Sequence, residues 1–279
     1  MSRERQDALE AFAASLAEAW RTGAKIALPD PRDRPKDRSE AYLVQDRMAA
    51  LIGAPVIGWK AGATSDGMRR RDGHDDIVPG RAFATCFFVG SDHAIPEELV
   101  KGARIEPEFA YRIDEPIPVR RQSWTAAEIA PRVTAHIAIE LIGSRYRTDT
   151  PQADLTTLTA IADNGNGVGL IIGDVIADPD AVDFHSHPIN LSVDGGEPAR
   201  NSPPDIRCSP LDALVDVANH LSARGIPLEA GTYVTTGSAT ETVAVIGGTR
   251  TVADFGPLGR ITLDFSGSPQ VKADGRPAG

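Results

Sequence analysis

From residue 55 onward the chain is divided into short apolar runs of strand length, separated by glycine and proline. Such runs, rich in Val, Ile, Thr and Phe, are typical of β-strands, and Gly and Pro mark the turns between them. Helical patterns interrupt these runs without regular alternation, which favours an α+β fold over a parallel βαβ sheet. The strand-prone runs are 56–62, 82–89, 104–113, 134–143, 169–176, 189–195, 232–237, 242–248 and 259–265.

The first 54 residues have a different, helical character. Apolar residues at helical spacing predict an amphipathic helix over 5–22. A second helix is expected to begin at Ser39 as N-cap and to end before Gly53. We therefore expect a helical N-terminal segment (1–54), a β-rich mixed-sheet domain (55–265) and a disordered tail (266–279) rich in Gly, Pro and charge.

Charge and cysteine usage restrict the class of protein. The formal net charge of -10 argues against nucleic acid as a partner, because phosphates require a basic surface. Cys86 and Cys208 lie far apart and form no CxxC motif, which is typical of a reducing compartment. No apolar run is long enough to span a membrane, and the N-terminus is too charged for a secretory signal. The expectation is a soluble, cytoplasmic protein.

The run 104–113, RIEPEFAYRI, contains two glutamates in otherwise apolar surroundings. In a strand, Glu106 and Glu108 share one face and lie about 7 Å apart at Cβ. Their carboxylates can converge on a divalent cation such as Mg²⁺ or Mn²⁺, which prefers oxygen ligands. Alone, the pair is more typical of a solvent-facing stripe paired with Arg104 or Arg112. Pro107 cannot donate to a ladder, which predicts an edge strand or an irregularity there.

Two further isolated charges shift this balance. Glu140 is the only ionisable group in the run 137–142, and Lys60 is isolated in the run 56–62. Ionisable groups in such apolar strands usually have a partner. Three glutamates would overcharge one dication by one unit, and Lys60 is a candidate to balance that excess. From these residues alone, a metal site and a surface stripe are about equally favoured.

Several motifs occur in an order that resembles a known family. They are GWKAGATS (58–65), EPEFAYRI (106–113), AIELIGSRY (138–146), ADNGNGVGLIIG (162–173), LEAGTYVTTGSAT (228–240) and ADFGPLGRITLDF (253–265). Together they resemble the 2-keto-4-pentenoate (2-hydroxypentadienoate) hydratase and 4-oxalocrotonate decarboxylase family of the fumarylacetoacetate-hydrolase-like superfamily. The resemblance covers residues 8 to 265.

The resemblance implies a site and a reaction. It implies Mg²⁺ or Mn²⁺ held by Glu106, Glu108 and Glu140, with Lys60 and either Asp75 or Asp76 in catalysis. Its implied substrate contacts are Thr64, Ser65, Asn166, Ser238 and Thr240. The expected reaction is hydration of a 2-hydroxy-2,4-dienoate in aromatic meta-cleavage degradation, through an enolate that the cation stabilises. The family also implies a homo-oligomer, or a complex with a homologous decarboxylase or hydratase.

The chain departs from the family pattern in its loops. Pro79 and Gly80 are adjacent, Gly165 to Gly167 replace Ala-Ser-Ser, and Cys208 to Pro210 replace Gly-His-Pro. These departures leave the substrate and the reaction open. The alternatives are a 4-oxalocrotonate-type decarboxylase, an acylpyruvate-type C–C hydrolase that would use His74, and a non-catalytic partner subunit.

Overall fold

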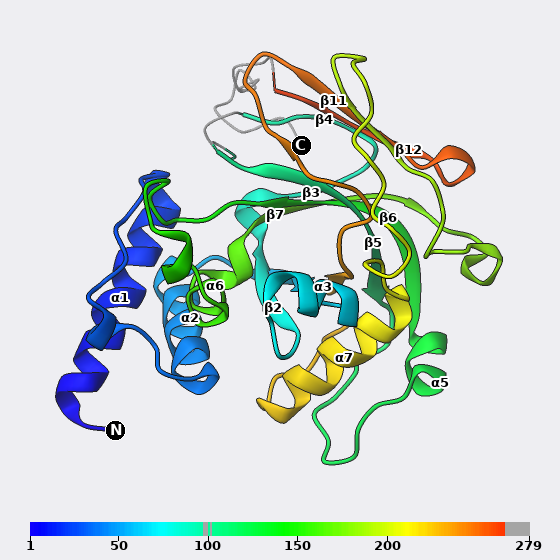
Figure 1. Ribbon diagram of the computed structural model, residues 1–279. Coiled ribbons are helices and arrows are strands. Elements are labelled where there is room, and N and C mark those ends of the chain that lie inside the picture. The colour runs from blue at the N-terminus through cyan, green and yellow to red at the C-terminus, as the bar shows by residue number, and fades with distance from the viewer. Residues whose placement is uncertain (97–99, 101, 266–279) are drawn as a thin grey trace, which may run out of the picture.

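A computed structural model of the 279-residue chain describes residues 1–96, 100 and 102–265 (Figure 1). The expected tail 266–279 lies outside the described residues. The chain forms two β-sheets and a group of helices, as the α+β expectation requires. The large sheet has the order β2-β1-β9-β5-β6-β7-β3, with β10 paired to β5, and the small sheet has the order β4-β12-β11-β8.

The elements have the following bounds. The large sheet contains β1 Val56–Gly62, β2 Val78–Phe83, β3 Phe87–Val89, β5 Arg104–Ile113, β6 Val133–Ile142, β7 Gly167–Val175, β9 Tyr233–Thr235 and β10 Val243–Ala244. The small sheet contains β4 Asp92–Ala94, β8 Asn190–Val193, β11 Arg250–Asp254 and β12 Arg260–Asp264. The helices are α1 Arg3–Thr22, α2 Arg38–Ile52, α3 Asp66–Asp72, α5 Ala126–Ile129, α6 Thr157–Ala162 and α7 Pro210–Ala223. Among the described residues no helix is long and apolar enough to cross a membrane.

The two predicted N-terminal helices are present as α1 and α2, and they pack together with α6 at one end of the molecule (Figure 1). Leu9, Phe12 and Leu16 of α1 are buried against Val44 and Met48 of α2. The predicted N-cap of α2 was wrong by two residues. Asp37, not Ser39, caps the helix, because its carboxylate accepts the backbone N–H of Glu40. Gly53 ends α2 in the left-handed conformation, as predicted.

Strands β5 and β6 form the centre of the large sheet, and their register gives its two faces opposite characters. Glu106 lies opposite Glu140, and Glu108 lies opposite Ala138. The residues on the other face of the two strands, such as Ile105 of β5 and Ile139 of β6, pack in the main hydrophobic core. Residues of the small sheet and of α7 belong to the same core. The predicted alternation is therefore confirmed, and it aims the three carboxylates away from the core.

Pro107 lies in an interior strand, so the edge-strand alternative was wrong and the predicted irregularity is confirmed. Strand β9 pairs with residues 110–112 of β5 and β10 pairs with residues 104–105, so the ladder on this side is open around Pro107. The segment 236–239 fills the opening. The backbone N–H of Ala239 donates to the Pro107 carbonyl at 2.9 Å, and the Thr236 hydroxyl donates to the Phe109 carbonyl at 2.8 Å.

A buried ion pair anchors the start of β7. Arg145 donates through Nε to Asp163 Oδ1, and the Arg145 backbone N–H donates to Asp163 Oδ2 at 2.8 Å. Arg145 Nη1 also donates to the Gly167 carbonyl at 2.8 Å. Both side chains are almost fully buried, so each charge depends on the other.

We expect the substitution Asp163→Ala to lower the free energy of unfolding by about 3–5 kcal/mol, because it leaves the Arg145 guanidinium buried and uncompensated. Urea denaturation measures this loss. The matched control is Asp149→Ala, which removes a carboxylate from the exposed pair with Arg147 and should leave the unfolding midpoint unchanged. Equal midpoints for the two variants would contradict the anchoring role of Asp163.

Candidate metal centre

The carboxylates of Glu106, Glu108 and Glu140 converge on one point. One oxygen atom from each lies within 4.8 Å of the others. Glu108 and Glu140 are each only 1% exposed, while Glu106 is half-buried and reaches the cavity described below. The antiparallel pairing of β5 with β6 creates this convergence, because it places Glu106 and Glu140 directly across from each other.

Neighbouring groups orient two of these carboxylates. The backbone N–H of Gly237 donates to Glu108 Oε2 at 2.7 Å, and the Thr235 hydroxyl donates to Glu140 Oε2 at 3.0 Å. Gly237 reaches Glu108 from the segment that fills the opening at Pro107. The irregularity in β5 therefore delivers a hydrogen-bond donor to the cluster.

Lys60 supplies the positive charge of the cluster. Its Nζ lies 3.0 Å from Glu140 Oε1, and its side chain is 7% exposed. Burial opposes its charge, but Glu140, Glu106 and Glu108 outweigh burial and raise the pKa of Lys60 above its usual value. Lys60 is therefore protonated at neutral pH in the metal-free protein.

With all three carboxylates ionised, the cluster would carry an excess of negative charge, so without a cation Glu106 and Glu108 hold protons more tightly. Burial and the charge of Glu140 raise the pKa of Glu106 to about 7, and burial with the same neighbours raises the pKa of Glu108 well above its usual value. One lysine does not neutralise three carboxylates, and a dication would restore the balance. The oxygen-only donor set, its spacing and its charge fit a hard divalent cation such as Mg²⁺ or Mn²⁺. These residues could therefore hold a metal ion.

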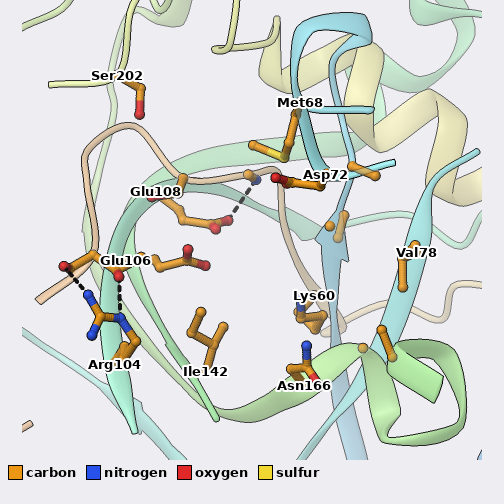
Figure 2. A pocket seen from close by; sticks show the side chains of 18 of the residues that line it. Lys60, Met68, Asp72, Val78, Arg104, Glu106, Glu108, Ile142, Asn166 and Ser202 are labelled. Carbon is orange, nitrogen blue, oxygen red and sulfur yellow. Dashed lines mark hydrogen bonds between the residues drawn. The ribbon is translucent and has the colours of Figure 1, made fainter. Parts of the chain in front are cut away.

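Glu106, Glu108 and Lys60 line a cavity of about 500 Å³. Figure 2 shows the two glutamates on one wall, with Lys60 and Asn166 on the opposite side. Glycines pack around the Lys60 side chain, and one of them, Gly165, also lines the cavity. A Cβ atom on Gly80, Gly165 or Gly167 would lie 3.1–3.3 Å from the aliphatic chain of Lys60. The same Gly80 Cβ would lie 2.1 Å from the Asn164 carbonyl oxygen, so β2 approaches the turn 164–166 with no room for a side chain.

Of the five predicted substrate contacts, the structure places three on the cavity wall, namely Asn166, Ser238 and Thr240. The other two lie behind it. Thr64 packs against Gly237, and the Ser65 hydroxyl caps α3 by accepting the backbone N–H of Met68 at 3.0 Å.

The structure places neither predicted acid/base candidate on the cavity wall. Arg38 donates to Asp75 at 2.5 Å, and Asp76 lies 3.8 Å from the imidazole of His220 on α7. Asp75 therefore turns toward the Arg38 guanidinium at the start of α2. Asp76 turns toward α7, where burial lowers the pKa of His220 to about 4 and keeps its imidazole neutral.

The cavity includes several side chains that sequence reasoning missed as site residues. They are Met68, Arg71 and Asp72 of α3, Arg104 at the start of β5, and Glu241 and Thr242, which follow the segment 236–239. His74, considered only for a hydrolase, also lines the cavity. The run RRRD at 69–72 is a cluster of charge that the sequence shows. The direction of its side chains depends on α3, a helix that the apolar pattern does not predict.

Comparisons with known proteins find relatives over most of this chain. No family model matches the chain. It is 26% identical to a 2-keto-4-pentenoate hydratase of Burkholderia vietnamiensis, over 93% of this chain and 98% of the relative. It is 27% identical to a 4-oxalocrotonate decarboxylase of Pseudomonas sp, over 77% of this chain and 80% of the relative. This chain is a homologue of these hydratases and decarboxylases.

Solved structures establish the fold of this homologue. The 4-oxalocrotonate decarboxylase from Pseudomonas putida G7, complexed with magnesium and adipate, superposes with a TM-score of 0.79 at 21% identity, over 95% of this chain and 98% of that one. A fumarylacetoacetate hydrolase family protein of Yersinia pestis superposes with a TM-score of 0.51 at 15% identity, over 76% and 94% of the two chains. The fold is therefore fumarylacetoacetate-hydrolase-like, as the motif order predicts.

We expect Glu106→Gln to weaken Mn²⁺ binding by at least about tenfold, because it removes an anionic oxygen from the cluster and leaves the fold intact. Titration followed by the Mn²⁺ electron paramagnetic resonance signal measures the affinity. Glu241→Gln is the control, since Glu241 lines the same cavity without belonging to the cluster. Wild-type affinity in Glu106→Gln would refute the assignment.

A second prediction concerns pH. Glu106 has a raised pKa of about 7 in the metal-free fold, so between its usual value of 4.5 and 7 the folded state binds more protons than the unfolded chain. Stability of the chelator-treated protein should therefore fall as pH rises from about 5 to about 7.5. Urea midpoints measure the fall, which should be smaller in Glu106→Gln and in saturating Mg²⁺. A midpoint with the same pH dependence in all three samples would contradict the prediction.

Proposed function

We propose that this chain is a divalent-metal-dependent hydratase that adds water to a 2-hydroxy-2,4-dienoate of the 2-keto-4-pentenoate type. The observation that carries the proposal is the convergence of three carboxylates beside Lys60, at a substrate-sized cavity that Glu106, Glu108 and Lys60 line. The names of the relatives, hydratase and decarboxylase, support the same chemistry.

The oxygen cluster suits a 2-oxo acid. When bound at Glu106, Glu108 and Glu140, the cation would act as a Lewis acid toward the keto oxygen and carboxylate of the substrate. The reaction begins with ketonisation of the dienol, which brings the remaining double bond into conjugation with the carbonyl group. Water then adds at the vinylogous carbon, and a proton must be moved in each step.

Lys60 and His74 are the cavity groups that we assign to proton movement. Lys60 Nζ carries a proton and stands beside Glu140, so it can donate to the substrate carboxylate or enolate oxygen. Burial lowers the pKa of His74, which keeps its imidazole neutral and able to accept a proton. Its Nδ1 lies 2.7 Å from the Thr157 hydroxyl, which orients the ring. The positions of Asp75 and Asp76 outside the cavity favour this assignment over theirs.

Decarboxylation is the second candidate, because one relative and one structural neighbour are named 4-oxalocrotonate decarboxylases. Both reactions need an electron sink next to the carboxylate of the substrate, which a cation held by Glu106, Glu108 and Glu140 would supply. Loss of CO₂ leaves the electron pair on the substrate, whereas hydration consumes water and releases nothing.

Turnover with two substrates distinguishes these reactions. Mg²⁺-loaded protein should consume 2-hydroxypenta-2,4-dienoate, seen as loss of dienol absorbance, without releasing CO₂. Release of CO₂ from 4-oxalocrotonate at a comparable rate would identify a decarboxylase instead. Inactivity toward both compounds with Mg²⁺ and with Mn²⁺ would refute the proposed function.

A matched pair of variants tests the catalytic assignment. We expect Lys60→Met to lower kcat by at least about 10²-fold, because it removes the proton donor from the cavity. Lys25→Met is the control, since Lys25 contacts the Ser144 carbonyl outside the cavity and should retain wild-type kcat. Near wild-type kcat in Lys60→Met would exclude Lys60 from proton transfer.

A further inference from the structure

Residues Asn164, Gly165 and Asn166 form a turn with three consecutive left-handed backbone conformations. Their φ angles are 56°, 60° and 61°. Left-handed geometry is unfavourable for most residues, and glycine and asparagine tolerate it best. The run DNGN at 163–166 therefore supplies the residue types that such a turn requires. The turn leads into β7 and packs against β2 and the side chain of Lys60.

The turn is fixed from both sides. Asn164 is buried, and its side-chain amide pairs with both backbone groups of Arg81 on β2, at 2.7 and 2.8 Å. The backbone N–H of Asn166 donates to the Asp163 carbonyl at 2.9 Å, and the Asn166 carbonyl accepts the backbone N–H of Gly143 at 2.7 Å. The backbone of Asn166 is thus held in one position, from which its side chain reaches the cavity (Figure 2).

The carboxamide of Asn166 has no hydrogen-bond partner among the described residues. Other polar groups of the wall are engaged. The hydroxyls of Ser238 and Thr240 donate to backbone carbonyls, and Lys60 pairs with Glu140. Within the described part of the chain, Asn166 is also the only carboxamide that lines this cavity. It offers an N–H donor and a carbonyl acceptor without adding charge.

Asn166 lies across the cavity from Glu106 and Glu108 and next to Lys60 (Figure 2). His74 lines the same cavity. Burial lowers the pKa of His74, and the charge of Lys60 acts in the same direction, so these two groups are near enough to interact. The carboxamide therefore shares the cavity with a neutral imidazole and an ammonium group.

We propose that the Asn166 carboxamide binds the water molecule that adds to the substrate, which makes Asn166 a catalytic residue of the hydration step. The inference rests on the proposed function, which places the 2-oxo acid group at the glutamate cluster. The keto oxygen and the carboxylate then face the cluster, so the rest of the substrate points away from it. A water molecule both donates and accepts hydrogen bonds, and a carboxamide matches both roles.

The addition step balances with the groups already assigned. The water oxygen forms a bond with the vinylogous carbon as one water proton passes to the His74 imidazole. The electron pair of the carbon–carbon double bond moves toward the keto oxygen. A proton from Lys60 enters at the carbon between the vinylogous carbon and the carbonyl group, and exchange with solvent restores both side chains. Asn166 transfers no proton and holds the water against the carbon that it attacks.

Only one of the two reaction steps uses water. Ketonisation of the dienol moves a proton from oxygen to carbon and requires no bound water. The role of Asn166 therefore predicts that its removal slows hydration and spares ketonisation. A residue that only supported the fold, or only bound the substrate, would affect both steps together.

Asn166→Gly tests the assignment, because glycine keeps the left-handed backbone and removes only the carboxamide. Mg²⁺-loaded protein receives 2-hydroxypenta-2,4-dienoate. Proton NMR of one sample follows the dienol, the conjugated ketone 2-oxopent-3-enoate and the hydrated product. We expect hydration to slow by at least about tenfold and ketonisation to change by less than about threefold, so that the conjugated ketone accumulates.

Asn190→Gly provides the matched control. Asn190 lies on β8 of the small sheet, is exposed and does not line the cavity, so the same substitution is made away from the site. It should keep the wild-type ratio of the two rates. Because both rates come from one sample, any loss of folded protein lowers them equally and leaves their ratio unchanged.

The outcomes separate the two proposals. A wild-type ratio in Asn166→Gly, or an equal fall in both rates, would overturn the role of Asn166 and leave the proposed function standing. If the wild-type protein forms no hydrated product from the dienol or from the conjugated ketone, hydration is not its reaction, and both proposals are overturned.

Discussion

Repulsion among three buried carboxylates is the constraint on which the site depends. Glu108 and Glu140 are almost completely removed from water, and Glu106 lies within reach of both. Such a cluster is unfavourable unless positive charge accompanies it. Lys60 provides one unit of that charge from β1, on the far side of β9 from β5 and β6. The cluster at the centre of the large sheet thus has too little positive charge for three ionised carboxylates, and a bound dication would supply it.

The backbone of β5 is adapted to this cluster. Pro107 lies between the two glutamates and has no N–H, so the ladder with β9 and β10 opens where the site needs a different partner. The segment 236–239 enters the opening and brings the Gly237 N–H to Glu108. One residue that cannot donate a hydrogen bond therefore lets another backbone group donate directly to a site carboxylate.

The sequence predicted the parts of this site that depend on strand periodicity. The shared face of Glu106 and Glu108, the orientation of Glu140 and the isolation of Lys60 follow from alternation and from the rarity of charge in apolar strands. The motif order predicted the fold, which the structural neighbours confirm.

What the sequence could not predict depends on loop and helix placement. Asp75 and Asp76 were expected at the site, but Asp75 pairs with Arg38 and Asp76 lies beside His220 of α7, both outside the cavity. Arg71 and Arg104 were not expected there, because their directions depend on α3 and on contacts with Thr242, which is distant in sequence. Local pattern carries no information about such long-range partners.

The glycines around Lys60 distinguish two sides of the site. On the side of Lys60 there is no room for a larger residue, whereas the other side is lined by side chains. Any side chain at Gly80, Gly165 or Gly167 would press on the methylene groups of Lys60, and at Gly80 it would also collide with the Asn164 carbonyl. Changes on this wall therefore displace the ammonium group itself. A second wall, formed by α3 and residues 238–242, is lined by side chains from elements other than those that pack around Lys60. A change of substrate contacts along that second wall would therefore leave the Lys60 ammonium beside Glu140.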